Sequence, residues 1–261
     1  EYNKKVNKAF EEWKTFANPI LTNLKPADSN KEIILKLSEE ILSKFTKLEL
    51  LDKYDVYQVL LAYWNETMND DVLLVIQDEL GYRLAKVTDD IKEEPKESKK
   101  SKKDSAKEKK PKEPKVIGWE GRLIPKQIVL DAFFEAEQKG IEKAEEKLSQ
   151  TESEFEEFIE ENTEDDELSQ EPEILKKCKT YEASIKSQKK TIADLKKKLD
   201  ENCRKRYDTF TDTEITDLLV NRKWYKTIDQ GIQNLYVTVA NHLTKRIVEL
   251  YERYENTLPE L

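Results

Sequence analysis

Histidine and cysteine, which often carry acid-base and nucleophilic catalysis, are scarce in this chain of 261 residues. The one histidine, His242, has no accompanying nucleophile motif, so we interpret it as a residue on a helix face. Cys178 and Cys203 lie far apart in a predicted continuous helix, about 37 Å at about 1.5 Å per residue, so they cannot form a disulfide with each other. We therefore predict no catalytic residue and two free structural thiols.

Metal and cofactor sites are not predicted in this segment either. The sequence contains no Cys-x-x-Cys or His-x-x-x-His pattern, and the pair Asp70 and Asp71 is most simply read as a turn or helix cap. The 5 glycines are too few for most phosphate-binding or dinucleotide-binding loops, which use several in one turn. A nucleotide-binding α/β domain is therefore not expected.

The charge pattern favours extended helices over one compact core, because 39% of residues are charged and only 37% are hydrophobic. Residues 92–115 are rich in lysine and proline and lack large apolar side chains, which predicts a disordered insertion. These lysines are a candidate site for nucleic-acid phosphates, but six interspersed acidic residues and the lack of aromatics favour a solubilising loop. Residues 152–173 hold twelve acidic side chains and no basic one, which predicts an exposed tip.

Residues 1–69 are predicted to form a small helical subdomain. Apolar residues recur at intervals of three and four over 3–16, 30–47 and about 52–68, which is typical of amphipathic helices. The first helix is expected to stop before Pro19, and Asn30 and Asp52 are candidate caps for the other two.

Residues 70–125 are predicted to form a small mixed α/β element. The continuous apolar run 72–76 and the alternation over 82–87 favour two short strands, and a helix over 70–80 is the alternative. Residues 116–125 are expected to complete the sheet, which makes 92–115 an insertion within this element.

Residues 126–208 are predicted to form a long antiparallel coiled-coil hairpin. Phe134, Ile141, Leu148 and Phe155 recur every seven residues in the first arm. Pro172 interrupts the helix, and the second arm then shows the clearest heptad pattern in the chain. Its seam is Cys178, Tyr181, Ile185, Gln188, Ile192, Leu195 and Leu199. The fold class expected for the chain is therefore mainly α.

Residues 209–261 are predicted to be helical, starting near Asp212, which is a candidate cap, and continuing beyond Leu250. Two heptad lines, one in the second hairpin arm and one in this last helix, predict surfaces for packing against each other and against a partner's helices. The candidate partner-binding residues are Ile185, Ile192, Leu195, Leu199, Trp224, Ile228, Ile232, Leu235 and Val239.

Residues 50–72, LLDKYDVYQVLLAYWNETMNDDV, closely resemble the C-terminal part of the modification subunit of type I restriction-modification systems. The segment GWEGRLIPK at 118–126, the stretch NRKWYKTID around Trp224 and the ending IVELYERYENTLPEL extend the resemblance over essentially the whole chain. That family's adenine-N6 methyltransferases carry an Asn-Pro-Pro-aromatic motif. The nearest string here, Asn18-Pro19-Ile20, lacks the second proline and the aromatic, so no catalytic role transfers to it.

The resemblance implies that this segment follows a methyltransferase domain that binds S-adenosylmethionine and is itself an assembly region. The implied partners are the specificity subunit and, through that complex, DNA and the restriction subunit, with a cytoplasmic location and no membrane. Two alternatives remain open: a freestanding coiled-coil scaffold that self-associates, and a nucleic-acid-binding module that uses the lysine-rich loop.

Overall fold

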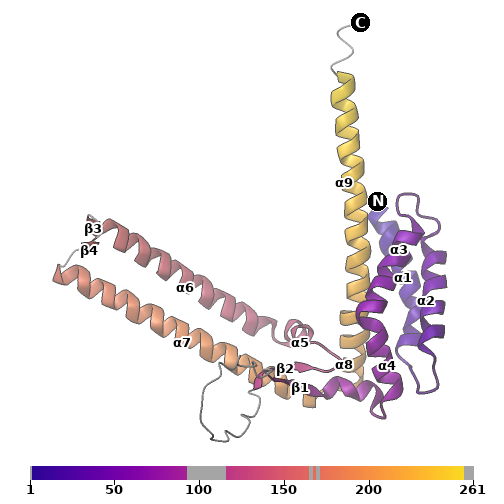
Figure 1. Ribbon diagram of the computed structural model, residues 1–261, viewed down its shortest axis with the longest axis horizontal. Coiled ribbons are helices and arrows are strands. Elements are labelled where there is room, and N and C mark those ends of the chain that lie inside the picture. Colours follow the sequence, from indigo (N-terminus) through magenta and orange to yellow (C-terminus); the bar gives the residue numbers. More distant parts are fainter. Residues whose placement is uncertain (1, 93–115, 165–166, 169–170, 256–261) are drawn as a thin grey trace, which may run out of the picture. The chain divides into compact units, whose positions relative to one another are not determined.

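The computed structural model describes residues 2–92, 116–164, 167–168 and 171–255, and its fold is mainly α, as predicted (Figure 1). The chain forms two compact units. Unit 1 comprises Glu1–Val87, Gly121–Ile124 and Phe210–Leu261, and unit 2 comprises Thr88–Glu120 and Pro125–Thr209. Both ends of the sequence therefore contribute to unit 1, whereas unit 2 contains the hairpin.

Unit 1 begins with the three predicted helices, α1 (Tyr2–Leu21), α2 (Asn30–Phe45) and α3 (Lys53–Tyr63). The Asp52 side chain caps α3 by accepting a hydrogen bond from the backbone N–H of Tyr54 at 2.8 Å. The prediction that α1 stops before Pro19 was wrong, because the helix continues to Leu21, whose side chain is fully buried. Burial of this last turn outweighs the single backbone hydrogen bond that proline removes near a helix end.

The predicted strands at 72–76 and 82–87 were wrong, and the alternative of a helix was right for the first of them. A short π-helix, η1 (Trp64–Met68), continues α3 into α4 (Asn69–Gln77), and the 3₁₀-helix η2 (Gly81–Lys86) follows. A short apolar run does not distinguish a strand from a buried helix. Val72, Val75 and Ile76 are all buried, at the three- and four-residue spacing of one helix face.

The C-terminal part of unit 1 contains α8 (Asp212–Thr216), the π-helix η3 (Asp217–Tyr225) and α9 (Lys226–Glu255). The start of α8 is close to the predicted position, but Thr211 is the capping residue instead of Asp212. Its hydroxyl accepts the backbone N–H of Glu214, whose carboxylate accepts the backbone N–H of Thr211.

A buried ion pair joins the N-terminal and C-terminal helices inside unit 1. The Nζ atom of Lys223 lies 2.6 Å from one carboxylate oxygen of Asp71 and donates to the other at 2.8 Å. Trp224 Nε1 also donates to Asp71, at 2.9 Å, and Lys223 donates to the backbone carbonyl of Leu123 at 2.7 Å. Burial raises the pKa of the Asp71 carboxyl, because desolvation outweighs the opposing effects of these donors.

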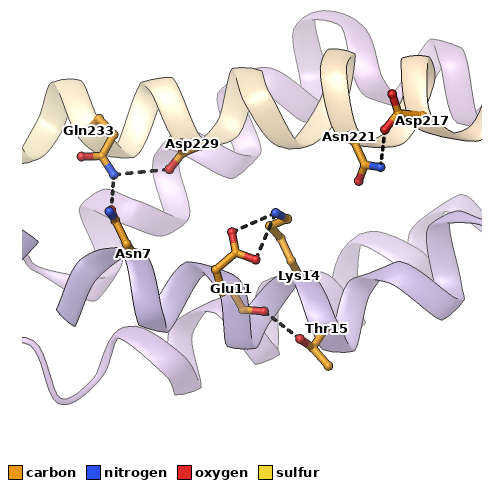
Figure 2. Close-up of polar contacts among 8 residues, drawn as sticks. All are labelled: Asn7, Glu11, Lys14, Thr15, Asp217, Asn221, Asp229 and Gln233. Atoms are coloured by element: carbon orange, nitrogen blue, oxygen red, sulfur yellow. Dashed lines mark hydrogen bonds and ion pairs between the residues drawn. The ribbon is translucent and has the colours of Figure 1, made fainter. Parts of the chain in front are cut away.

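Helix α1 packs antiparallel along η3 and the first part of α9. Trp13 meets Tyr225 edge to face, with ring centroids 5.8 Å apart, and Tyr2 stacks on Tyr236 at 5.8 Å. Between these ring contacts, Gln233 bridges the two helices by donating to the side-chain oxygen of Asn7 at 2.8 Å (Figure 2). Helix α1 therefore packs against α9 as far as Tyr236.

Unit 2 contains a two-stranded sheet of β1 (Thr88–Lys92) and β2 (Val116–Gly121). The strand expected within 116–125 is confirmed, but its partner lies later than the predicted 82–87. The predicted disordered insertion falls almost entirely outside the described residues. Trp119 of β2 is buried, donates through Nε1 to Asp200 at 2.8 Å and meets Tyr207 edge to face at 5.5 Å.

The hairpin consists of α5 (Lys126–Phe133), α6 (Glu135–Glu161) and α7 (Pro172–Asp208), with β3 (Thr163–Glu164) and β4 (Glu167–Leu168) between its long arms. Ion pairs join Glu145 to Lys196 at 2.6 Å and Glu152 to Lys189 at 2.7 Å. Since residue numbers rise along α6 while their partners' numbers fall along α7, the two arms are antiparallel, as predicted.

Replacing Lys223 by methionine should lower the free energy of unfolding of unit 1 by about 3 kcal/mol at pH 7, because it leaves the Asp71 carboxyl buried without its cation. The matched control is Arg222→Met at the preceding position. Arg222 pairs with Asp217 on the surface, where ion pairs contribute about 0–1 kcal/mol. Urea unfolding followed by tryptophan fluorescence measures both, and equal losses would contradict the role of the buried pair.

Replacing each of two helical glycines by alanine should change the stability of its unit in opposite directions. A Cβ at Gly231 of α9 would collide with the Cγ1 methyl of Val59 on α3, whereas a Cβ at Gly140 of α6 would meet open space. Gly140→Ala should stabilise unit 2 by about 0.5–1 kcal/mol through helix propensity. Gly231→Ala should destabilise unit 1, because the β-branched side chain of Val59 has one strongly preferred rotamer in a helix and cannot easily move aside. Thermal unfolding of the two variants tests this, and stabilisation by both would show that α3 and α9 are loosely packed.

Candidate protein-interaction surface

The histidine and the two cysteines are the side chains that the sequence singles out for their reactivity. His242 is exposed on α9, and Cys178 and Cys203 are both buried in α7. Burial raises the pKa of the Cys203 thiol to about 11, so it is protonated near neutral pH and is a poor nucleophile. Asp71 was expected to lie in a turn or a helix cap, but its carboxylate pairs with Lys223 in the core. In the described part of the chain, no three or more His, Cys, Asp and Glu side chains form a group able to hold a metal ion.

Helix α9 has two halves with different surroundings. Its first half is built into unit 1, where Ile228 and Ile232 are fully buried and α3 packs alongside. In its second half, every residue from Asn241 to Glu255 is exposed. Because no side chain in this half of α9 is buried by the rest of the described structure, its apolar side chains indicate an interaction surface.

The exposed half of α9 carries a regular apolar line, here called the α9 ridge: Leu243, Ile247, Leu250 and Tyr254. Ile247 is 66% exposed and Tyr254 is 61% exposed, which is unusual for large apolar side chains. Spacings of four, three and four residues place all four on one seam, as in a coiled coil. No described helix is both long enough and apolar enough to cross a bilayer.

The residues beside the α9 ridge also match coiled-coil positions. With Leu243 and Leu250 at d positions, Ile247 occupies an a position, and isoleucine at a with leucine at d favours two-stranded packing. Arg246 and Arg253 then occupy g positions, next to the seam, where charged residues select the partner. A helix with apolar a and d positions and acidic flanks would complement this surface.

Three of the predicted partner-binding residues lie in the core of unit 1. Trp224, Ile228 and Ile232 are each 0% exposed, so the surface offered to a partner excludes them. Their heptad spacing reflects packing against the chain's own helices. Leu235 and Val239 are half-buried, at the point where α9 leaves its contacts with α1 and α3.

The remaining predicted partner-binding residues belong to the seam between α6 and α7. Ile192 is buried, Ile185 and Leu199 are half-buried, and Leu195 is 40% exposed. Ile185 borders an open groove of about 530 Å³, and Leu195 with Leu199 borders another of about 320 Å³. Such grooves accompany any two-helix seam, because two helices cover only part of each other.

The partner-binding residues predicted from the sequence end at Val239 and include none of the α9 ridge. The heptad-like line that begins at Trp224 continues beyond Val239 through the polar positions His242 and Arg246. A signal was nevertheless present, since a second line with the same three- and four-residue spacing begins at Tyr236 and passes through every ridge residue. The buried and exposed lines of α9 are therefore two different stripes of one helix.

No family model matches this chain, and neither a curated protein nor a solved structure matches it.

Proposed function

We propose that this chain is the C-terminal assembly region of a type I restriction-modification adenine-N6 DNA methyltransferase subunit. In this role the α9 ridge packs against a helix of the specificity subunit, and unit 1 connects that contact to a catalytic domain that this segment lacks. The methyl donor, S-adenosylmethionine, would be bound by that catalytic domain. The assembly would act on DNA in the cytoplasm, together with a restriction subunit.

The observation that carries this proposal is the exposed, regularly spaced α9 ridge on a helix whose other half is fixed in a core. Fixing one half of α9 lowers the entropy lost when a partner helix binds the other half. The resemblance of residues 50–72 to the family supplies the partner's identity. That stretch includes Trp64 and Met68, which are buried in unit 1, and Asp71 of the buried ion pair. The resembling segment thus helps to build the base from which the ridge extends.

Replacing two ridge residues by glutamine tests whether α9 binds the specificity subunit or has only a structural role. The variant Leu243→Gln with Ile247→Gln should weaken binding to the specificity subunit of the same system by at least ~10-fold, because burying each side chain contributes about 1.5–3 kcal/mol. Glutamine keeps a good helix propensity, and circular dichroism should show unchanged helicity. Isothermal titration calorimetry with the purified specificity subunit measures the affinity.

The matched control for this experiment is Lys245→Gln with Glu252→Gln on the opposite face of the same helical segment. It introduces the same two glutamines, leaves the net charge unchanged and should preserve the affinity. Equal binding by wild type and the ridge variant would overturn the proposal. So would a wild-type chain that sediments alone as a dimer and becomes monomeric when the ridge is changed, since the ridge would then serve self-association.

A further inference from the structure

The two arms of the hairpin carry opposite charge. The described helix α6 has a large excess of glutamate, whereas α7 holds nine lysines and two acidic residues between Ile174 and Leu199. Pairing with α6 accounts for only some of the lysines of α7. Lys189 and Lys196 pair with glutamates of α6, and Lys177 lies over the ring of Phe158 at 5.5 Å.

Five other lysines of α7 occupy b and f heptad positions, outside the a and d seam, and are here called the α7 lysine face: Lys176, Lys179, Lys186, Lys190 and Lys197. Lys186 also borders the groove next to Ile185. All five are exposed, and within the described ranges none of them forms an ion pair or a side-chain hydrogen bond. Their heptad positions lie opposite the buried residues Cys178 and Ile192. The lysine face spans about 31 Å along one helix, at about 1.5 Å per residue.

We propose that the α7 lysine face binds the phosphate backbone of duplex DNA. Five unpaired ammonium groups on one straight helix complement a rigid, evenly charged polyanion, and binding would gain free energy by releasing condensed counterions. The side chains between the lysines include Thr180, Ala183 and Ser187, which are short enough to let a phosphate backbone approach closely. The inference rests on the proposed function only for placing DNA near this chain.

The chemistry of the lysine face favours a duplex over other anionic partners. Binding of single strands relies on aromatic side chains that stack on bases, and no aromatic residue lies between Lys179 and Lys197 apart from Tyr181, which packs in the seam. Membrane binding by a basic helix requires large apolar residues that enter the bilayer. Ala183 and Ala193, which are exposed near these lysines, are too small for that role, and Leu195, which is 40% exposed, belongs to the seam with α6.

Salt-dependent binding of a labelled 20-base-pair duplex to the full chain tests the inference by fluorescence anisotropy. The triple variant Lys179→Gln, Lys186→Gln and Lys190→Gln should weaken binding at low salt by more than ~10-fold. It should also reduce the slope of log K against log salt by about 2.7, since each lost phosphate contact contributes about 0.9.

The control is Lys139→Gln, Lys143→Gln and Lys147→Gln, which removes the same charge from α6 and should leave both the affinity and the slope unchanged. A second variant that lacks 96–113 should keep the dependence on the α7 lysines. The inference is overturned if wild type does not bind the duplex at about 25 mM salt or if both triple variants lose the same amount of affinity. It is also overturned if deletion of 96–113 alone abolishes binding. Tighter binding to a single strand or to anionic lipid vesicles than to the duplex would also overturn it.

The two proposals fail independently, because the DNA experiment contains no specificity subunit. Loss of duplex binding in the α7 variant with full binding to the specificity subunit would support the lysine face alone. Loss of specificity-subunit binding in the ridge variant with unchanged duplex binding would support the α9 ridge alone.

Discussion

The architecture of unit 1 depends on one buried ion pair between residues 152 positions apart in the sequence. Asp71 follows the first group of helices, and Lys223 precedes the helix that carries the exposed ridge. Burying two charges is costly, so the pair adds little net stability, but losing either partner leaves an isolated charge in the core. The pair therefore favours one fold of unit 1 over others, because only one arrangement of the two chain segments pairs both charges.

Both partners of the pair lie within or just after π-helical turns, η1 and η3. The wider turn of a π-helix changes which consecutive residues face the same neighbour, and here the adjacent residues Lys223 and Trp224 both reach Asp71. Neither π-helix has a sequence pattern that distinguishes it from an α-helix. The sequence therefore predicted that helices would occur here but could not predict the contact that holds them together.

The hairpin was easier to predict than the rest of the fold, because its pattern is local and repetitive. Heptad spacing from Cys178 to Leu199 and the proline at 172 were enough to predict two antiparallel arms, and α6 and α7 follow that prediction. The run 72–76 had no such repetition, and its apolar residues fit a strand as well as a buried helix. Tertiary burial of Val72, Val75 and Ile76 decided the outcome, and burial is not visible in five residues of sequence.

The candidate surfaces show the same distinction between pattern and environment. Heptad spacing predicted that α9 packs against other helices, but periodicity does not say which of its stripes the chain covers itself. The structure separates them: the stripe through Ile228 is buried, and the stripe through Ile247 is exposed. The ridge and the α7 lysine face also differ in physics, since apolar burial withstands salt whereas phosphate contacts weaken steeply with it. Because the ridge lies in unit 1 and the lysine face in unit 2, a single chain holds one surface suited to permanent assembly and another suited to reversible contact with a polyanion.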